Sequence, residues 1–310
     1  MAGRIGVVGS NMMDLVTFVE RMPDAGETLA APRFMTGHGG KGANQAVAAA
    51  RLGSAVVMVS KVGDDAFGAA QRANFERHGI DAAHVTTAEG AASGVAPIFV
   101  EPSGENRILI VKGANDRLTP DDVDRAAGAL KGCDLLLLQL EIPFETVRHT
   151  LAWGKANGVP TLLNTAPALP GLDPASVKDA TFLVPNEGEL ALLTGLLVDG
   201  EDDAAKAASS LVEAGIETVI VTLGARGALV VDEAGARHVP AVRVEPVDTT
   251  GAGDAFIGSF AHHYVMGQGI EAAIGRAVRY AAHAITRPGT QASYADAAEF
   301  AAFCRELSGS

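Results

Sequence analysis

The chain has 310 residues, 48% of them apolar and 5% aromatic, which is enough to bury a large core in one α/β domain or in two smaller domains. Its formal net charge of −13 repels a phosphate backbone, so we expect no nucleic-acid partner. No apolar run reaches the roughly 20 residues that a membrane-spanning helix needs, so we expect no membrane partner either.

The first predicted element is a buried strand over 5–8, which ends in a turn at Gly9. This N-terminal stretch lacks a long apolar segment followed by a cleavage site of small residues, so we expect no signal peptide. The two cysteines, Cys133 and Cys304, lie far apart and lack the spacing of metal ligands. We therefore expect a reducing, cytoplasmic setting, although a single disulfide between them stays open.

Short apolar runs and helical patterns alternate along most of the chain. Further apolar runs of strand length lie at 55–59, 134–140, 159–163, 181–184 and 218–222. Such runs are typical of strands that are covered on both faces. Helix signals lie between them, including an alanine-rich segment that stops at Gly53 and an amphipathic segment over 201–214. The alternation predicts an α/β fold, a three-layer sandwich with a mostly parallel central sheet flanked by helices.

Two regions break this alternation and have the pattern of exposed antiparallel strands, 15–20 and 94–111. In the second region, a turn over 102–106 separates two apolar stretches. We expect a single domain over 1–310 with a small β-sheet lid formed from about 12–38 and 92–114, and a homodimer made through this lid. The pattern alone equally allows an edge extension of the main sheet.

A glycine-rich segment at 37–42 formally matches the dinucleotide fingerprint G-x-G-x-x-G. However, Pro32 interrupts the preceding segment, and no long apolar strand leads into the turn. Gly42 follows Lys41 where a Walker A loop needs Ser or Thr, so that loop is excluded. We interpret the segment as a sugar site, because Lys41 and Asn44 can donate to hydroxyls that approach a bare glycine backbone.

The run Gly-Ala-Gly-Asp at 251–254 opens an apolar helix that continues towards Val265. A helix start presents unpaired N–H groups and the positive end of the macrodipole, and glycines let an anion approach closely. Asp254 would repel a phosphate, but it can take a proton from an attacking hydroxyl. By itself, so short a pattern is more often a glycine turn with a helix cap.

Longer runs around both motifs carry a resemblance to a known family. The run Asp-Thr-Thr-Gly-Ala-Gly-Asp at 248–254 resembles the C-terminal signature of the PfkB-type carbohydrate kinases, and Gly-Gly-Lys-Gly-Ala-Asn-Gln-Ala at 39–46 resembles their N-terminal signature. The two occur in the expected order. Supporting runs lie at 139–141, 164–168, 185–189, 222–227 and 289–293. The chain resembles the family over nearly its whole length, and within the family it is most similar to the ribokinase branch.

The resemblance implies an ATP-dependent kinase that phosphorylates the primary hydroxyl of D-ribose, with Mg²⁺ at the phosphates. It implies a catalytic base and an anion hole at Asp254, Gly251, Ala252 and Gly253. It implies sugar contacts from Asp14, Gly40, Lys41, Asn44 and Glu141. It implies nucleotide contacts from Asn186, Glu189, Thr222, Gly224 and Gly227. It implies a potassium ion, held partly by backbone carbonyls, at Asp248, Thr250, Ala284, Arg287, Gly289 and Ser293. The Asn-x-x-Glu motif at 186–189 also fits a capped helix start.

One position departs from the ribokinase pattern. Ribokinases often carry Asn two positions before the sugar-binding Asp, where this chain has Met12, with Asn11 one place earlier. Methionine cannot replace the hydrogen bonds of an amide, so kinases for fructose, 2-keto-3-deoxygluconate or adenosine stay open as alternatives. From other classes, the alternatives are a non-catalytic sugar-binding protein on the same scaffold and, more remotely, a nicotinamide-dependent oxidoreductase.

Overall fold

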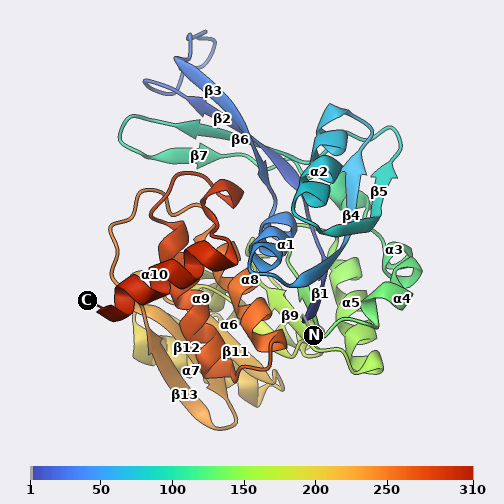
Figure 1. The fold of residues 1–310 in the computed structure, drawn as a ribbon, viewed down its shortest axis with the longest axis vertical. Coiled ribbons are helices and arrows are strands. Elements are labelled where there is room, and N and C mark those ends of the chain that lie inside the picture. Colours follow the sequence, from blue (N-terminus) through green and yellow to red (C-terminus); the bar gives the residue numbers. More distant parts are fainter. Residues whose placement is uncertain (1–2, 310) are drawn as a thin grey trace.

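The computed structural model describes residues 3–309, which form a body of three layers with a smaller sheet beside it (Figure 1). The central layer is a nine-stranded sheet with the order β13-β12-β11-β10-β9-β8-β1-β4-β5. Its strands are β1 (Arg4–Val8), β4 (Ala55–Gly63), β5 (Asp81–Ala88), β8 (Leu135–Leu138), β9 (Thr161–Asn164), β10 (Phe182–Val184), β11 (Thr218–Thr222), β12 (Gly227–Asp232) and β13 (Gly235–Pro240). Strands β11 to β5 pair in parallel, whereas β12 and β13 add an antiparallel edge.

Helices cover both faces of this sheet and bury one apolar cluster on each. The first cluster involves α1 (Lys41–Arg51), α2 (Ala66–Arg77), α8 (Ala252–Val265), α9 (Ile270–Ala284) and α10 (Ala297–Gly309). The second involves α3 (Pro120–Arg125), α4 (Ala127–Leu130), α5 (Phe144–Asn157), α6 (Glu187–Thr194) and α7 (Glu201–Glu213). Short 3₁₀ helices lie at η1 (Gly113–Arg117), η2 (Pro174–Val177), η3 (Gly224–Arg226) and η4 (Gln291–Ser293).

The four leucines of β8 show why the central strands are apolar without interruption. Successive side chains of a strand point to opposite faces, so Leu135 and Leu137 join the first cluster while Leu136 and Leu138 join the second. All four are fully buried. The prediction of an α/β sandwich with a mostly parallel central sheet is therefore confirmed. The main-sheet strands that the apolar runs did not reveal are β5, β12 and β13, at the two ends of the sheet.

A second sheet lies apart from the layered body, at the upper left of Figure 1. It has the order β3-β2-β6-β7, from β2 (Met12–Phe18), β3 (Arg33–Gly39), β6 (Val95–Val100) and β7 (Asn106–Ile108). The outer pairs are antiparallel, as the sequence suggested, but the central pair β2 and β6 runs parallel. The strands do not extend the edge of the main sheet, because they pair only among themselves within the described residues.

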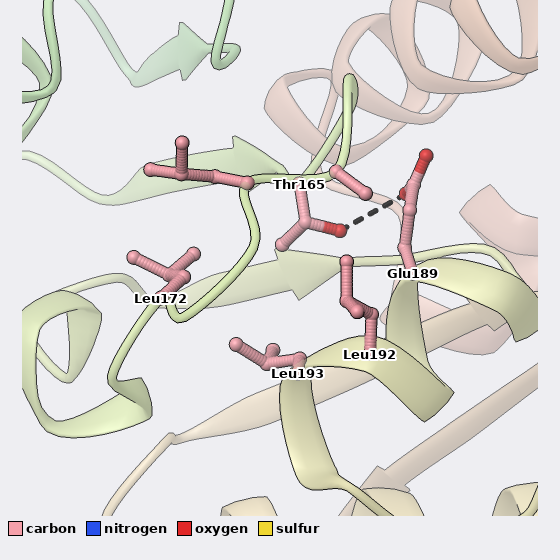
Figure 2. A pocket seen from close by; sticks show the side chains of 7 residues that line it. Thr165, Leu172, Glu189, Leu192 and Leu193 are labelled. Atoms are coloured by element: carbon pink, nitrogen blue, oxygen red, sulfur yellow. Dashed lines mark hydrogen bonds between the residues drawn. The ribbon is translucent and has the colours of Figure 1, made fainter.

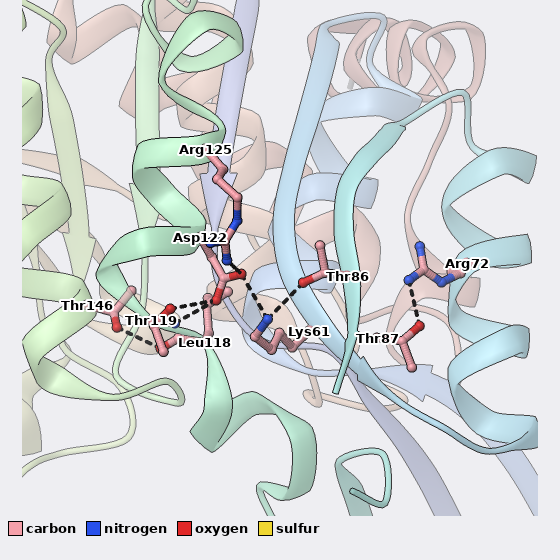
Figure 3. Close-up of polar contacts among 9 residues, drawn as sticks. All are labelled: Lys61, Arg72, Thr86, Thr87, Leu118, Thr119, Asp122, Arg125 and Thr146. Carbon is pink, nitrogen blue, oxygen red and sulfur yellow. Dashed lines mark hydrogen bonds and ion pairs between the residues drawn. The ribbon is translucent and has the colours of Figure 1, made fainter. Parts of the chain in front are cut away.

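A partly buried lysine ties the edge of the main sheet to α3 (Figure 3). Lys61 on β4 donates to Thr86 on β5 at 2.9 Å and to the Asp122 carboxylate on α3 at 2.8 Å. Asp122 also accepts from the backbone and hydroxyl of Thr119, which closes a capping box at the start of α3, and from Arg125 at 2.5 Å. The side chain of Asp122 is only 2% exposed, so these donors replace its lost hydration.

Over residues 3–309, none of the helices combines the length and the apolar character needed to cross a membrane.

Candidate active site

A cleft with an empty volume of about 600 Å³ lies where three parallel strands of the main sheet end. Asn164, Val184 and Thr222 are the last residues of β9, β10 and β11, and all three line it. Open α/β sheets bind ligands beyond the carboxyl ends of their strands. The first turns of α1, α6 and α8 also reach the cleft, so three helix N-termini direct their positive ends at the same space. The cleft therefore suits an anionic ligand.

Asp254 lies in the first turn of α8 and faces this cleft. The turn before it depends on Gly251, whose φ of 76° is left-handed and whose Cβ, if present, would lie 2.4 Å from Thr290. The hydroxyl of Tyr294 donates to the Gly251 carbonyl at 3.0 Å, and burial raises the pKa of this phenol well above its ordinary value. Gly251, Ala252 and Gly253 all line the cleft beside Asp254.

Two amides hold the Asp254 carboxylate. Asn44 donates to Oδ2 at 2.9 Å and Gln45 donates to Oδ1 at 3.0 Å. Both come from α1, so the fold joins the two glycine-rich motifs of the sequence in one site. Asn44 had been expected near the sugar. Gln45 had not been singled out, although it lies inside the N-terminal signature and next to Asn44.

Glu141 follows β8 and lies at the start of α1. Its Oε2 accepts from the Lys41 backbone N–H at 2.9 Å and from the Ser10 hydroxyl at 2.5 Å. Gly40 offers α1 no side-chain cap, so Glu141 supplies a carboxylate to the helix N-terminus from another segment. Gly40 has a φ of 88°, and a Cβ there would lie 2.7 Å from the Asn11 backbone. The Glu141 carboxylate and the turn at Gly40 therefore together hold the start of α1 in place.

Asp14 on β2 completes the group of predicted sugar residues. It lies opposite Gly37 across the β2–β3 pair, and its Oδ1 would be 2.2 Å from a Cβ at Gly39. Burial raises the pKa of Asp14 to about 7, with further contributions from the negative charges of Glu141 and Asp254. The structure therefore gathers three carboxylates around a small volume.

Lys41 is the cation among these carboxylates. Burial opposes its charge, but Asp254, Glu141 and Glu189 together raise the pKa of its ammonium above the ordinary value. Lys41 lines the cleft and so stays available as a charged donor. A sugar hydroxyl that enters between Lys41 and the carboxylates meets donors and acceptors at once.

On the far side of the cleft, Asn186 and Glu189 form the capping box of α6. Glu189 accepts from the Asn186 backbone at 3.1 Å, from its side chain at 2.9 Å and from the Thr165 hydroxyl at 3.0 Å. Figure 2 shows the last contact, with Leu172, Leu192 and Leu193 around a small apolar pocket behind it. Asn186 and Glu189 therefore cap a helix and also line the cleft, so the two interpretations of the Asn-x-x-Glu motif are compatible.

The other expected nucleotide residues are spread over one turn. Thr222 ends β11 and lines the cleft. Gly224 and Gly227 lie just beyond it, in the connection through η3 to β12, and are not part of the cleft lining.

The residues expected around potassium lie on two adjoining segments. Asp248 accepts from the backbone of Thr250 and from that of Gly289, each at 2.9 Å, and so joins the turn before α8 to the segment after α9. The Ala284 carbonyl accepts from the Arg287 N–H at the end of α9, and the Ser293 hydroxyl donates to the Thr290 carbonyl in η4. Across residues 3–309, no cluster of three or more His, Cys, Asp or Glu side chains suits a metal ion.

Comparison with known proteins places these features in a family. Residues 3–297 match the pfkB family carbohydrate kinases. The deoxyribokinase of Salmonella typhimurium is 52% identical over 296 residues, which cover 96% of this chain and 97% of that protein. The ribokinase of Mus musculus is 39% identical over 297 residues, which cover 94% and 92%.

A solved structure agrees with this. The ribokinase of Arabidopsis thaliana, solved with ribose and ATP, superimposes with a TM-score of 0.89 at 29% identity over 98% of this chain and 99% of that one. The resemblance seen in the two signatures is thus confirmed over the whole chain. The chain is a sugar kinase that acts on an alcohol group, and it belongs to the pfkB family of carbohydrate kinases.

Proposed function

We propose that the chain transfers the γ-phosphoryl group of ATP to the primary hydroxyl of a pentose, and that it prefers 2-deoxy-D-ribose to D-ribose. The observation that carries the reaction is the position of Asp254, which lies in the first turn of α8 and accepts hydrogen bonds from two amides of α1. Asp254 takes the proton of the sugar hydroxyl. The hydroxyl oxygen bonds to the γ-phosphorus while the bond between that phosphorus and the ADP oxygen breaks. The products are a sugar 5-phosphate and ADP.

We assign the N–H groups of Gly251, Ala252 and Gly253 to the charge that develops on the transferred group. The Ala252 N–H donates to the Thr249 carbonyl at 3.3 Å, so it has to exchange this partner for the phosphoryl oxygen. Helix-start amides in a site that excludes water stabilise such charge without reorganising. Lys41 adds a positive charge on the same side of the cleft. On the sugar, we assign Asp14, Gly40, Asn44 and Glu141 to the remaining hydroxyls, because carboxylates accept where Lys41 and Asn44 donate.

Preference for a 2-deoxy sugar rests on Met12. Side chains two apart in a strand share a face, so Met12 lies on the Asp14 face of β2. Its side chain is 2% exposed and offers no strong hydrogen-bonding atom. A sugar that lacks a hydroxyl binds to an apolar site without an energetic penalty. A sugar that carries this hydroxyl must give up the hydroxyl's hydrogen bonds to water in order to bind there. The likeness to a deoxyribokinase supports the same choice, and ribose remains the second candidate, supported by the likeness to ribokinases.

The nucleotide side of the cleft would be formed by Asn186, Glu189 and Thr222, with Gly224 and Gly227 in the turn beyond. Magnesium bound with ATP neutralises phosphate charge and usually keeps several waters, which agrees with a side of the cleft that offers one partly engaged carboxylate. We propose potassium at the junction of the two segments that Asp248 joins, with backbone carbonyls of Thr250, Ala284, Arg287, Gly289 and Ser293 as ligands. Use of ATP supports a cytoplasmic location.

We further propose that the four-stranded sheet is a lid over the sugar and the interface of a homodimer. Phe34 and Met35 on β3 and Leu109 directly after β7 are 59%, 45% and 63% exposed, which is unusual for large apolar side chains in one small region. A second copy of the chain would cover them. Light scattering after size-exclusion chromatography should give a dimer for the native chain and a monomer for Phe34→Asp with Leu109→Asp. A native monomer would contradict this.

A panel of acceptors tests the substrate. Initial rates with ATP, Mg²⁺ and K⁺ would be compared for 2-deoxyribose, ribose, fructose, 2-keto-3-deoxygluconate and adenosine. We expect kcat/KM to be highest for 2-deoxyribose, about 10- to 100-fold above ribose, the range that one misplaced hydroxyl gives in an apolar pocket. Equal or higher kcat/KM for ribose would reverse the preference. Sugar binding with no turnover of any acceptor would favour a binding protein instead.

A further inference from the structure

Two chains of buried amides end on the Asp254 carboxylate. In the first, Gln139 Nε2 donates to Gln45 Oε1 at 2.7 Å, and Gln45 Nε2 donates to Asp254 Oδ1 at 3.0 Å. Gln45 and Gln139 are both 0% exposed. Gln45 lies on α1, and Gln139 directly follows the central strand β8. This chain is called the inner arm.

The second chain, the outer arm, comes from the opposite side. Asn74 Nδ2 on α2 donates to Gln291 Oε1 in η4, Gln291 Nε2 donates to Asn44 Oδ1, and Asn44 Nδ2 donates to Asp254 Oδ2, each at 2.9 Å. Asn74 and Gln291 are 2% and 6% exposed. Five amides from four segments of the chain are thus linked to one carboxylate, which Asn44 and Gln45 of α1 contact directly.

Every amide in both arms turns its NH₂ end towards Asp254. A carboxylate only accepts, so the first amide must present N–H, its carbonyl then faces outward, and the next amide must follow suit. The direction has a cost at the end of the inner arm, because Oε1 of Gln139 is buried with no partner among the described residues. Flipping both amides of the inner arm would place Gln139 Oε1 in a different position, but it would also turn the side-chain carbonyl of Gln45 towards Asp254. The arrangement therefore serves the carboxylate.

We propose that Gln45 and Gln139 in the inner arm, and Gln291 and Asn74 in the outer arm, are positioning residues that hold the Asp254 carboxylate aimed at the acceptor hydroxyl. The inference rests on the proposed role of Asp254 as the base. Hydrogen bonds to both oxygens prevent rotation of the carboxylate. In a buried site such linked bonds strengthen one another.

Other charges also face Asp254 and must be separated from the arms in a test. Lys41 lies on α1, Asp14 on β2, Glu141 after β8, and the Tyr294 phenol next to η4. Asp14, Lys41 and Glu141 are assigned to sugar binding, so a disturbance of these residues changes the sugar KM. A change in the aim of Asp254 changes kcat at saturating sugar and ATP. Comparing kcat with the sugar KM therefore separates Asp254 from the other charges.

The experiment compares Gln45→Met and Gln291→Met with the native chain. Methionine has a similar length and does not donate. We expect kcat at pH 7 to fall about tenfold or more while the sugar KM stays within about threefold. Thr146→Val is the control, because it removes a buried 2.7 Å hydrogen bond to the Leu118 carbonyl outside the cleft. It should lower Tm and leave kcat and the sugar KM unchanged.

The outcomes separate this inference from the proposed base. If Asp254→Asn, measured in parallel, keeps near-full kcat, the proposed base is wrong. If Asp254→Asn loses activity while both methionine variants keep the native kcat, only the positioning role is wrong. A fall in kcat accompanied by an equal rise in the sugar KM means loose packing and also overturns it. Should Gln45→Met be insoluble, Gln291→Met and Asn74→Leu decide through the outer arm.

Discussion

Asn44 and Asp254 are 210 residues apart in the sequence, yet the Asn44 amide donates a 2.9 Å hydrogen bond to the Asp254 carboxylate. The bond joins the start of α1 to the start of α8, which are the two helices that carry the glycine-rich motifs. The proposed base and two of the proposed sugar residues, Lys41 and Asn44, therefore come from one pair of packed helices. Each prediction below tests one part of this arrangement.

Replacing Met12 with Asn should change the choice of sugar. The new amide can hydrogen-bond a hydroxyl that methionine cannot, so the ratio of kcat/KM for ribose to that for 2-deoxyribose should rise about tenfold. Met13→Leu is the control, since Met13 points to the other face of β2 and leucine preserves its volume. Steady-state kinetics with both sugars give the ratio. An unchanged ratio in Met12→Asn would remove Met12 from the sugar site.

Gly39→Ala should displace the Asp14 carboxylate. A Cβ at this position would lie 2.2 Å from Asp14 Oδ1, so the carboxylate has to move. We expect the sugar KM to rise about tenfold or more while the ATP KM stays the same, because misplacement by an ångström is costly in a site of fixed geometry. Gly128→Ala, where a Cβ meets nothing within 4 Å, should change neither KM.

Asp14 should reduce stability at neutral and alkaline pH. Its pKa rises from 3.8 to about 7 on folding, chiefly through burial, so unfolding releases a proton between about pH 4 and pH 7. The stability it contributes is present below pH 4 and is lost as the pH rises to 7. Asp14→Asn should therefore raise the free energy of unfolding in urea by about 2–4 kcal/mol relative to the native chain at pH 8. The two proteins should differ little at pH 4. Equal unfolding at both pH values would contradict this.

Asp122 should act in the opposite direction. Burial opposes its charge, but its hydrogen bonds with Lys61, Thr119 and Arg125 lower the pKa from 3.8 to about 2. The stabilisation is present above pH 4 and is lost as the pH falls towards 2. Asp122→Asn should cost about 2 kcal/mol at pH 7 and remove this acid-dependent loss. Arg72→Met breaks only an exposed contact with Thr87 on the same sheet edge and should change stability by less than about 0.5 kcal/mol (Figure 3). Urea unfolding between pH 2 and pH 7 compares the two.

Much of the fold could be predicted because the central strands are buried on both faces. The leucines of β8 form a continuous apolar run for that reason. The strand β13 did not stand out, because it lies at a sheet edge where residues such as Arg237 and His238 are partly exposed. The parallel pairing of β2 with β6 depends on a long connection that no local pattern records.

The site divides in the same way. Residues in local motifs, such as Lys41 and Asp254, could be predicted because glycine turns and helix starts leave a pattern in the sequence. The contacts of Gln45, Gln139 and Gln291 could not, although all three lie in the runs that carry the resemblance, because the partner of each amide lies far along the chain. The separation is 94 residues between Gln139 and Gln45 and 247 between Gln291 and Asn44. Only the folded structure brings them together.

The most direct measurement is the kcat of Asp254→Asn at saturating ATP and sugar. If Asp254 is the base, kcat should fall by a factor of about 10²–10⁴ while the KM for ATP stays within about threefold, because the asparagine side chain preserves volume and cannot take the proton. A kcat within about threefold of the native value would contradict the account and require another base in the cleft.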